Sequence, residues 1–147
     1  MKLKVFLGGT CNSSTWRDEI IPMLEKEGIE YFNPVTDNWT EESQKIEESE
    51  KESCNIHLYV ITKEMKGVYS IAEAVDSAWS IDHQGLMTSI FYVIDDGFDE
   101  HQVKSLKSTA KLISDINDKA ITYVGKKDFK KVIDSFKYLL SAYSLVK

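Results

Sequence analysis

Residues 56–62 read Ile56-His57-Leu58-Tyr59-Val60-Ile61-Thr62, a nearly continuous run of apolar and β-branched side chains. Such a run is typical of a β-strand that is buried on both faces, as in a parallel sheet covered by helices. A second buried run, Ser89-Ile90-Phe91-Tyr92-Val93-Ile94, ends at the turn signal Asp95-Asp96-Gly97. The two runs predict neighbouring strands of an α/β fold.

Helical and strand patterns alternate along the whole chain. Strands are predicted at residues 4–7, 29–33, 56–62, 89–94 and 120–125. Helices are predicted at residues 16–26, within 40–52, from 69 or 70 to about 81, and at 101–116 and 129–143. Alternation of this kind predicts a parallel sheet with helices on both faces, a three-layer sandwich. The flavodoxin-like strand order 2-1-3-4-5 is the arrangement we expect.

Composition limits the classes of function. A chain of 147 residues forms one domain of ordinary size, and we expect a single domain over residues 1–147. The net charge of −6 argues against a nucleic-acid polymer as the ligand, because phosphate backbones bind basic faces. The longest apolar run is shorter than the ~20 residues of a membrane span. We therefore expect a cytoplasmic protein, without a membrane partner, that binds a small molecule or another protein.

The cysteines and glycines indicate no cofactor or metal. Cys11 and Cys54 are too few and too far apart for a zinc site or a redox pair. The segment Gly8-Gly9-Thr10 matches neither the dinucleotide fingerprint nor the phosphate-loop pattern. We interpret it as a tight turn after the first strand, where the backbone can approach a ligand closely.

The predicted topology brings two distant segments together. In the order 2-1-3-4-5 the switch point lies between the ends of the first and third strands, where ligands bind. Gly8-Gly9-Thr10 follows the first strand, and the helix containing Glu73 follows the third strand. Glu73 lies off the main apolar stripe of that helix, which frees its carboxylate from packing. We therefore expect Glu73 and the glycine segment to share one crevice.

Several segments together resemble one known family. They are Val5-Phe6-Leu7-Gly8-Gly9-Thr10, Trp16-Arg17, Phe32-Asn33-Pro34 and Ser70-Ile71-Ala72-Glu73-Ala74. Their order and spacing over roughly the first 95 residues are similar to those of the nucleoside 2-deoxyribosyltransferase-like proteins. The resemblance implies cleavage of the bond between a deoxyribose and a base, with Glu73 as the nucleophile. It also implies a homo-oligomer, because family members complete their active sites with residues from a neighbouring subunit.

A glutamate suits this chemistry. Glycosyl transfer with retention needs a carboxylate that attacks the anomeric carbon and holds the sugar as an ester. A second group should assist the departing base, and Asp37, in the loop after Asn33-Pro34, is the first candidate. Glu47, Glu48 and Glu52 are secondary candidates on a helix that otherwise looks solvated.

Other side chains around the crevice are expected to bind the substrate. Tyr69 and Ser70 would offer hydroxyls to the sugar, and Trp16 or Trp39 would stack on a base, as Phe32 also could. Asn33 would form a hydrogen bond near the switch point. The predicted substrate-binding set is Gly8, Gly9, Thr10, Trp16, Asn33, Trp39, Tyr69 and Ser70.

The sequence thus predicts N-glycosidic bond cleavage or transfer on a (deoxy)nucleoside or nucleotide. Whether the acceptor is a second base or water stays open, because exclusion of water depends on packing. Two alternatives remain. One is cleavage of a nicotinamide dinucleotide, which also uses a glutamate beside an anomeric carbon. The other is a module that binds a nucleotide derivative without turnover.

Overall fold

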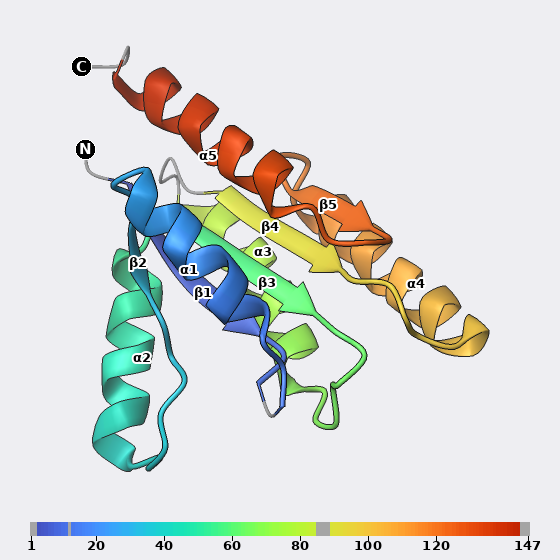
Figure 1. Cartoon of the computed structure of the whole chain (residues 1–147). Helices are drawn as coiled ribbons and strands as arrows, with labels where there is room; N and C mark the ends of the chain where they lie inside the picture. The colour runs from blue at the N-terminus through green and yellow to red at the C-terminus, as the bar shows by residue number, and fades with distance from the viewer. Residues whose placement is uncertain (1–2, 12, 85–88, 145–147) are drawn as a thin grey trace.

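The computed structural model describes residues 3–11, 13–84 and 89–144. Its parallel sheet contains β1 (Lys4–Gly9), β2 (Glu30–Phe32), β3 (Ile56–Ile61), β4 (Ser89–Ile94) and β5 (Ile121–Val124). The strand order is β2-β1-β3-β4-β5, which confirms the predicted flavodoxin-like topology. Figure 1 shows the twist of the sheet and the helices on either side.

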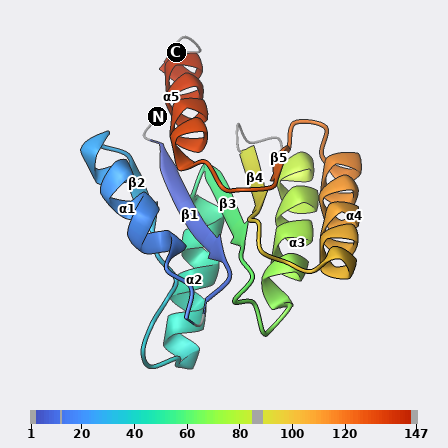
Figure 2. The same ribbon diagram turned by 45° about the vertical axis from the view of Figure 1, so that its right-hand side comes forward.

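The helices form the two outer layers. They are α1 (Trp16–Lys26), α2 (Glu41–Ser53), α3 (Tyr69–Gln84), α4 (Glu100–Ile116) and α5 (Phe129–Ser144). Helices α1 and α5 cover one face of the sheet, whereas α3 and α4 cover the other (Figures 1 and 2). Helix α2 lies beside α3, near the β2 edge. None of the helices in the described ranges is long and apolar enough to cross a bilayer.

Two hydrophobic cores lie on opposite faces of β3. Leu58 and Val60 belong to the core beneath α1 and α5, and Tyr59 and Ile61 belong to the core beneath α3 and α4. Every residue of β3 is buried. The prediction of a strand enclosed on both faces is therefore confirmed.

Strand β1 extends further than the predicted residues 4–7. Gly8 and Gly9 are its last two residues, so the prediction of a tight turn at these glycines was wrong. Gly8 pairs with Tyr59 and Gly9 with Val60 of β3. Gly9 has a φ of +113°, and a Cβ atom at this position would collide with the backbone of Val60. These glycines therefore allow the backbone of β1 to approach that of β3 closely, whereas the sequence analysis expected a close approach to a ligand.

Helices α2 and α3 differ in how they contact the sheet. Helix α2 is solvated as predicted: none of its residues is fully buried, and Thr40 caps it by accepting a hydrogen bond from the Ser43 amide. In α3 the predicted apolar stripe included Trp79, but this side chain is 56% exposed. Ala78, which the predicted stripe also included, is buried as expected, and Trp79 lies about 100° further around the helix.

Candidate active site

A cavity of about 400 Å³ lies at the carboxyl ends of β1 and β3. The loops after β1, β2 and β3 form its walls, together with the first turns of α3 and the Glu47 side chain of α2. This is the switch point of the strand order, where the topology predicted a ligand crevice. Its volume is within the ~300–1,000 Å³ of typical small-molecule sites.

A buried guanidinium supports the end of β1. Arg17, in the first turn of α1, donates hydrogen bonds to the carbonyl oxygens of Leu7 at 3.0 and 3.2 Å, Thr10 at 2.8 Å and Gly9 at 3.4 Å. Its guanidinium also stacks on the ring of Trp16, 4.3 Å from the ring centroid. Arg17 lines the cavity and places a fixed positive charge beneath it. The sequence contains a signal for this supporting role, because Arg17 is a charged residue on the apolar face of its helix.

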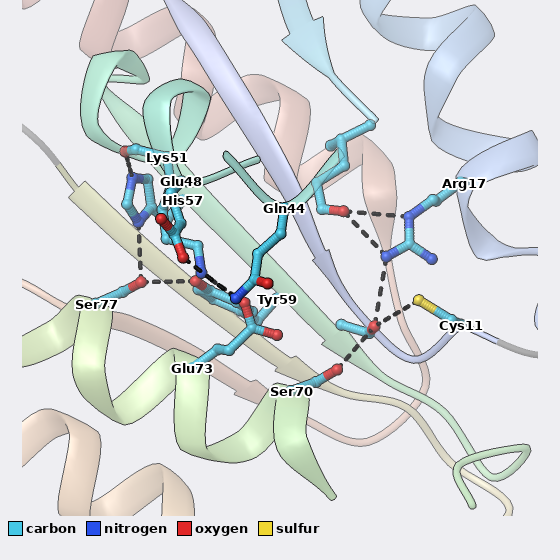
Figure 3. A network of polar contacts seen from close by, with 12 residues as sticks. Cys11, Arg17, Gln44, Glu48, Lys51, His57, Tyr59, Ser70, Glu73 and Ser77 are labelled. Carbon is cyan, nitrogen blue, oxygen red and sulfur yellow. Dashed lines mark hydrogen bonds and ion pairs between the residues drawn. The ribbon is translucent and has the colours of Figure 1, made fainter. Parts of the chain in front are cut away.

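Hydroxyl groups join the end of β1 to α3 and β3. The Ser70 Oγ atom donates to the Gly9 carbonyl oxygen at 2.9 Å, and the Thr62 amide donates to Thr10 Oγ1 at 3.0 Å. Arg17 and the Cys11 thiol donate to the same Gly9 carbonyl oxygen, at 3.4 and 3.6 Å, and Figure 3 shows the side chains of Ser70, Arg17 and Cys11 converging. These contacts fix the first turn of α3 relative to β1 and thereby position Glu73.

The Glu73 carboxylate, which lines the cavity, forms an ion pair with Lys51 of α2. Its Oε2 atom accepts a hydrogen bond from Lys51 Nζ of α2 at 2.6 Å, and the two side chains are 14% and 23% exposed. The Lys51 ammonium also lies 5.3 Å from the centroid of the Phe6 ring. The pair therefore fixes the direction of the carboxylate and balances its charge where little water is present.

A second carboxyl group, that of Glu47 on α2, lines the same cavity. Burial raises the pKa of this carboxyl above its ordinary value, and the negative charge of Glu73 raises it further, whereas Lys51 acts in the opposite direction. Glu47 and Lys51 are one helical turn apart and therefore share a face of α2. Glu48 and Glu52, by contrast, are exposed and do not line the cavity.

A buried hydrogen-bond chain lies under the ion pair (Figure 3). His57 Nε2 is 2.6 Å from the Lys51 carbonyl oxygen, so Nε2 carries the proton and donates. Nδ1 then accepts from Ser77 Oγ at 3.0 Å, and the Tyr59 hydroxyl donates to Ser77 Oγ at 2.6 Å. The chain connects the last turn of α2 to β3 and α3, and it holds the main chain of Lys51 in place.

Neutral His57 gives a testable pH dependence of stability. Burial lowers the pKa of His57 from 6.5 to about 4. The unfolded chain therefore binds a proton that the folded chain excludes as the pH falls from 6.5 towards 4. We expect His57 to reduce the free energy of unfolding by about 3 kcal/mol over this window. Urea unfolding of wild type and His57→Gln should show a steeper loss in the wild type; equal pH dependence would contradict this role.

Seven of the ten predicted site residues line the cavity. They are Gly8, Gly9, Thr10, Trp39, Tyr69, Ser70 and Glu73. The topology therefore brings together residues from the loops after β1, β2 and β3. Trp39 and Tyr69 are 64% and 75% exposed, so both aromatic rings are accessible to a ligand.

The other three predicted residues lie outside the cavity lining. Trp16 is buried against Phe129 in the core, and its indole Nε1 donates to the Thr10 carbonyl oxygen at 2.9 Å. Asn33 is exposed and accepts a hydrogen bond from the Val35 amide at 3.1 Å. Asp37 is exposed in the loop between β2 and α2. Through its hydrogen bond to the Thr10 carbonyl, Trp16 supports the wall of the cavity from the core side.

The model of the nucleoside 2-deoxyribosyltransferase-like family matches residues 2–88, more than half of the chain. The chain belongs to this family. No curated protein matches it. Every residue that lines the main cavity falls within the match, from Phe6 to Glu73.

The remainder of this deoxyribosyltransferase-like chain completes the fold without forming the main cavity. Strand β4 pairs with β3, and β5 forms the far edge of the sheet, away from the switch point. Within the described ranges, no group of three His, Cys, Asp or Glu side chains is placed to hold a metal ion. Carboxylates, hydroxyls, aromatic rings and the Arg17 guanidinium line the cavity, and the Lys51 ammonium binds its Glu73 carboxylate.

Proposed function

We propose that this protein cleaves or transfers the N-glycosidic bond of a (deoxy)nucleoside or nucleotide, with Glu73 as the nucleophile. The observation that carries the proposal is the position of Glu73. Its carboxylate extends from the first turns of α3 into the cavity at the switch point, and Lys51 binds one of its two oxygens. Family membership supports the same class of reaction.

In the first step, a Glu73 carboxylate oxygen attacks C1′ of the sugar while the bond from C1′ to the base breaks. The electron pair of that bond leaves with the base, and the sugar becomes an ester of Glu73. Lys51 binds Oε2, and among the described residues none donates a hydrogen bond to Oε1. Oε1 is therefore the oxygen that we assign to the attack. The carboxylate charge also stabilises the oxocarbenium-like transition state.

Polar and aromatic groups around Glu73 suit a nucleoside. Ser70 already donates its hydroxyl proton to the Gly9 carbonyl, so its oxygen can accept a hydrogen bond from a sugar hydroxyl. Trp39, from the loop after β2, and Tyr69, from the start of α3, are exposed rings on different walls of the cavity. We propose that one or both rings stack on the base.

We also propose that the protein acts as a homo-oligomer. Large apolar side chains are exposed around the cavity: Tyr69 at the start of α3, its neighbour Val68 in the preceding loop, and Val35 and Trp39 in the loop after β2. A neighbouring subunit would cover them and reduce access of water to the ester. Light scattering coupled to size exclusion should therefore give a mass larger than that of one chain, and a monomer at assay concentrations would contradict this point.

The activity is tested by chromatographic detection of free base. Purified protein is incubated with deoxynucleosides, ribonucleosides, their monophosphates and a nicotinamide dinucleotide, each with and without a second base as acceptor. We expect release of base from a nucleoside or nucleotide; dependence on the acceptor identifies a transferase, and release without it identifies a hydrolase. Release from the dinucleotide alone would redefine the substrate. Binding of a nucleotide without release from any substrate would contradict the proposed enzyme.

A further inference from the structure

The Lys51 ammonium contacts the Glu73 carboxylate from outside the main cavity. Glu73 lines the main cavity, whereas Lys51 lines a second cavity of about 290 Å³ whose walls come mostly from α2 and α3. The two side chains meet at 2.6 Å, between Lys51 Nζ and Glu73 Oε2. The contact therefore leaves the space for a sugar open, and it can persist while the other carboxylate oxygen, Oε1, reacts.

The Lys51 side chain is held at both of its ends. Its main-chain carbonyl accepts a hydrogen bond from buried His57 at 2.6 Å (Figure 3), and its ammonium lies 5.3 Å from the centroid of the Phe6 ring. Lys51 and Glu73 are only partly exposed, so water screens their charges less than it does at an open surface. A charge fixed in such surroundings acts on the carboxylate without a cost of reorganisation.

The charge of Glu73 changes in opposite directions in the two steps of glycosyl transfer. In the first step the carboxylate becomes a neutral ester, and a cation beside it stabilises the starting carboxylate more than the ester. In the second step the ester becomes a carboxylate again, so the same cation stabilises the charge that develops as the bond to C1′ breaks. Lys51 therefore favours release of the sugar from Glu73 over its capture.

We propose that Lys51 is the catalytic residue that promotes release of the sugar from its ester with Glu73. The inference rests on the proposed function of the cavity. After Oε1 has attacked C1′, Oε2 is the carbonyl oxygen of the ester, and Lys51 Nζ still donates a hydrogen bond to it. Water or a second base then attacks C1′ and loses its proton to solvent. The electron pair of the bond between C1′ and Oε1 returns to the carboxylate, and Lys51 keeps its own protons.

The test removes the charge of Lys51 and measures how long the ester persists. Lys51→Met keeps an unbranched side chain without the ammonium, Lys51→Gln keeps a neutral hydrogen-bond donor, and Lys51→Arg keeps the positive charge. Lys45→Met is the matched control, because Lys45 is an exposed residue of α2 that lines neither cavity. Circular dichroism and urea unfolding show which variants are folded.

The probes are 7-methylguanosine and its 2′-deoxy form, each with and without adenine as the acceptor. Their base is already cationic, so it leaves as a neutral molecule and needs no added proton. Chromatography gives the steady-state rate of base release, corrected with a blank that contains no protein. Intact mass spectrometry after acid quenching gives the concentration of protein that carries the sugar. The rate divided by this concentration is the rate constant of the second step, and the rate divided by the concentration of free protein, at saturating substrate, is that of the first.

We expect Lys51→Met to lower the rate constant of the second step at least about 10-fold, so that a larger fraction of the protein carries the sugar. The rate constant of the first step should fall by less than about threefold, because the carboxylate still attacks. Lys51→Gln should give a second step between those of Lys51→Met and wild type, and Lys51→Arg and Lys45→Met should resemble the wild type. If Lys51→Met does not fold, the second-step rates of wild type, Lys51→Arg and Lys51→Gln carry the same test.

Other outcomes overturn the proposal in distinguishable ways. Equal slowing of both steps, with no rise in the fraction that carries the sugar, would limit Lys51 to positioning Glu73. A folded Lys51→Met protein that releases no base would assign Lys51 to the first step, and one with wild-type rates would exclude any role. Wild-type protein that releases base from neither probe would contradict the proposed function itself.

Discussion

Replacing Glu73 by glutamine is expected to lower the rate of base release at least about 10³-fold while the protein stays folded. The amide is similar in size to the carboxylate but has no negative charge, so it cannot form the ester or stabilise positive charge at C1′. The large loss should appear with every substrate that the wild type cleaves, regardless of its leaving group. Initial rates measured by chromatography of the free base test this expectation.

The folded state of the Glu73→Gln variant should change little. The substitution removes the charged partner of Lys51, whose side chain is 23% exposed and can be hydrated. We expect a loss of about 1–2 kcal/mol in the free energy of unfolding, because the pair is only partly exposed. Asp76→Asn is the matched control, because Asp76 is an exposed carboxylate one turn later on α3, outside the main cavity. Its rate should stay close to that of the wild type, and an unchanged rate in Glu73→Gln would exclude Glu73 as the nucleophile.

Gly9→Ala is expected to destabilise the fold by about 3 kcal/mol or more. An alanine would be strained at a φ of +113°, and its Cβ atom would meet the backbone of Val60 in the adjacent strand. Separation of β1 from β3 would also disturb the Gly9 carbonyl, to which Arg17 and Ser70 donate hydrogen bonds. Urea unfolding measures the change in stability.

Gly125→Ala separates the two causes of this effect. Gly125 has a similar φ of +127°, but a Cβ atom there would meet nothing within 4 Å. Its substitution therefore introduces the backbone strain without the collision, and we expect a loss of about 1–2 kcal/mol. Equal losses at the two positions would show that the contact between Gly9 and Val60 contributes nothing.

The topology and the position of Glu73 could be predicted because both depend on local patterns. The buried run at 56–61 and the helix that begins at Tyr69 are close in sequence, so the distance from the strand end to Glu73 is fixed by a short loop. The strand order then places that helix beside the end of β1. No distant contact has to be known for this inference.

The role of Gly9 and the orientation of Glu47 depended on contacts that the sequence does not display. Gly8 and Gly9 looked like a turn, because the reason for their small size lies in β3, roughly fifty residues away in the chain. Glu47 looked solvated, because α2 exposes most of its surface and only its docking against α3 reveals the inner face. For Trp79, the helical period could not distinguish the edge of the apolar stripe from its centre.

The central claim is that Glu73 becomes covalently attached to the sugar. Fluorine at C2′ of a nucleoside withdraws electrons and thereby destabilises the oxocarbenium-like transition states of both steps. When the base is a good leaving group, the first step still proceeds and the ester accumulates. Intact mass spectrometry after acid quenching should then show a mass increase equal to the fluorinated sugar, and peptide mapping should place it on Glu73. An adduct on another residue, or base release from the ordinary substrate through a reaction that inverts the configuration at C1′, would contradict the account.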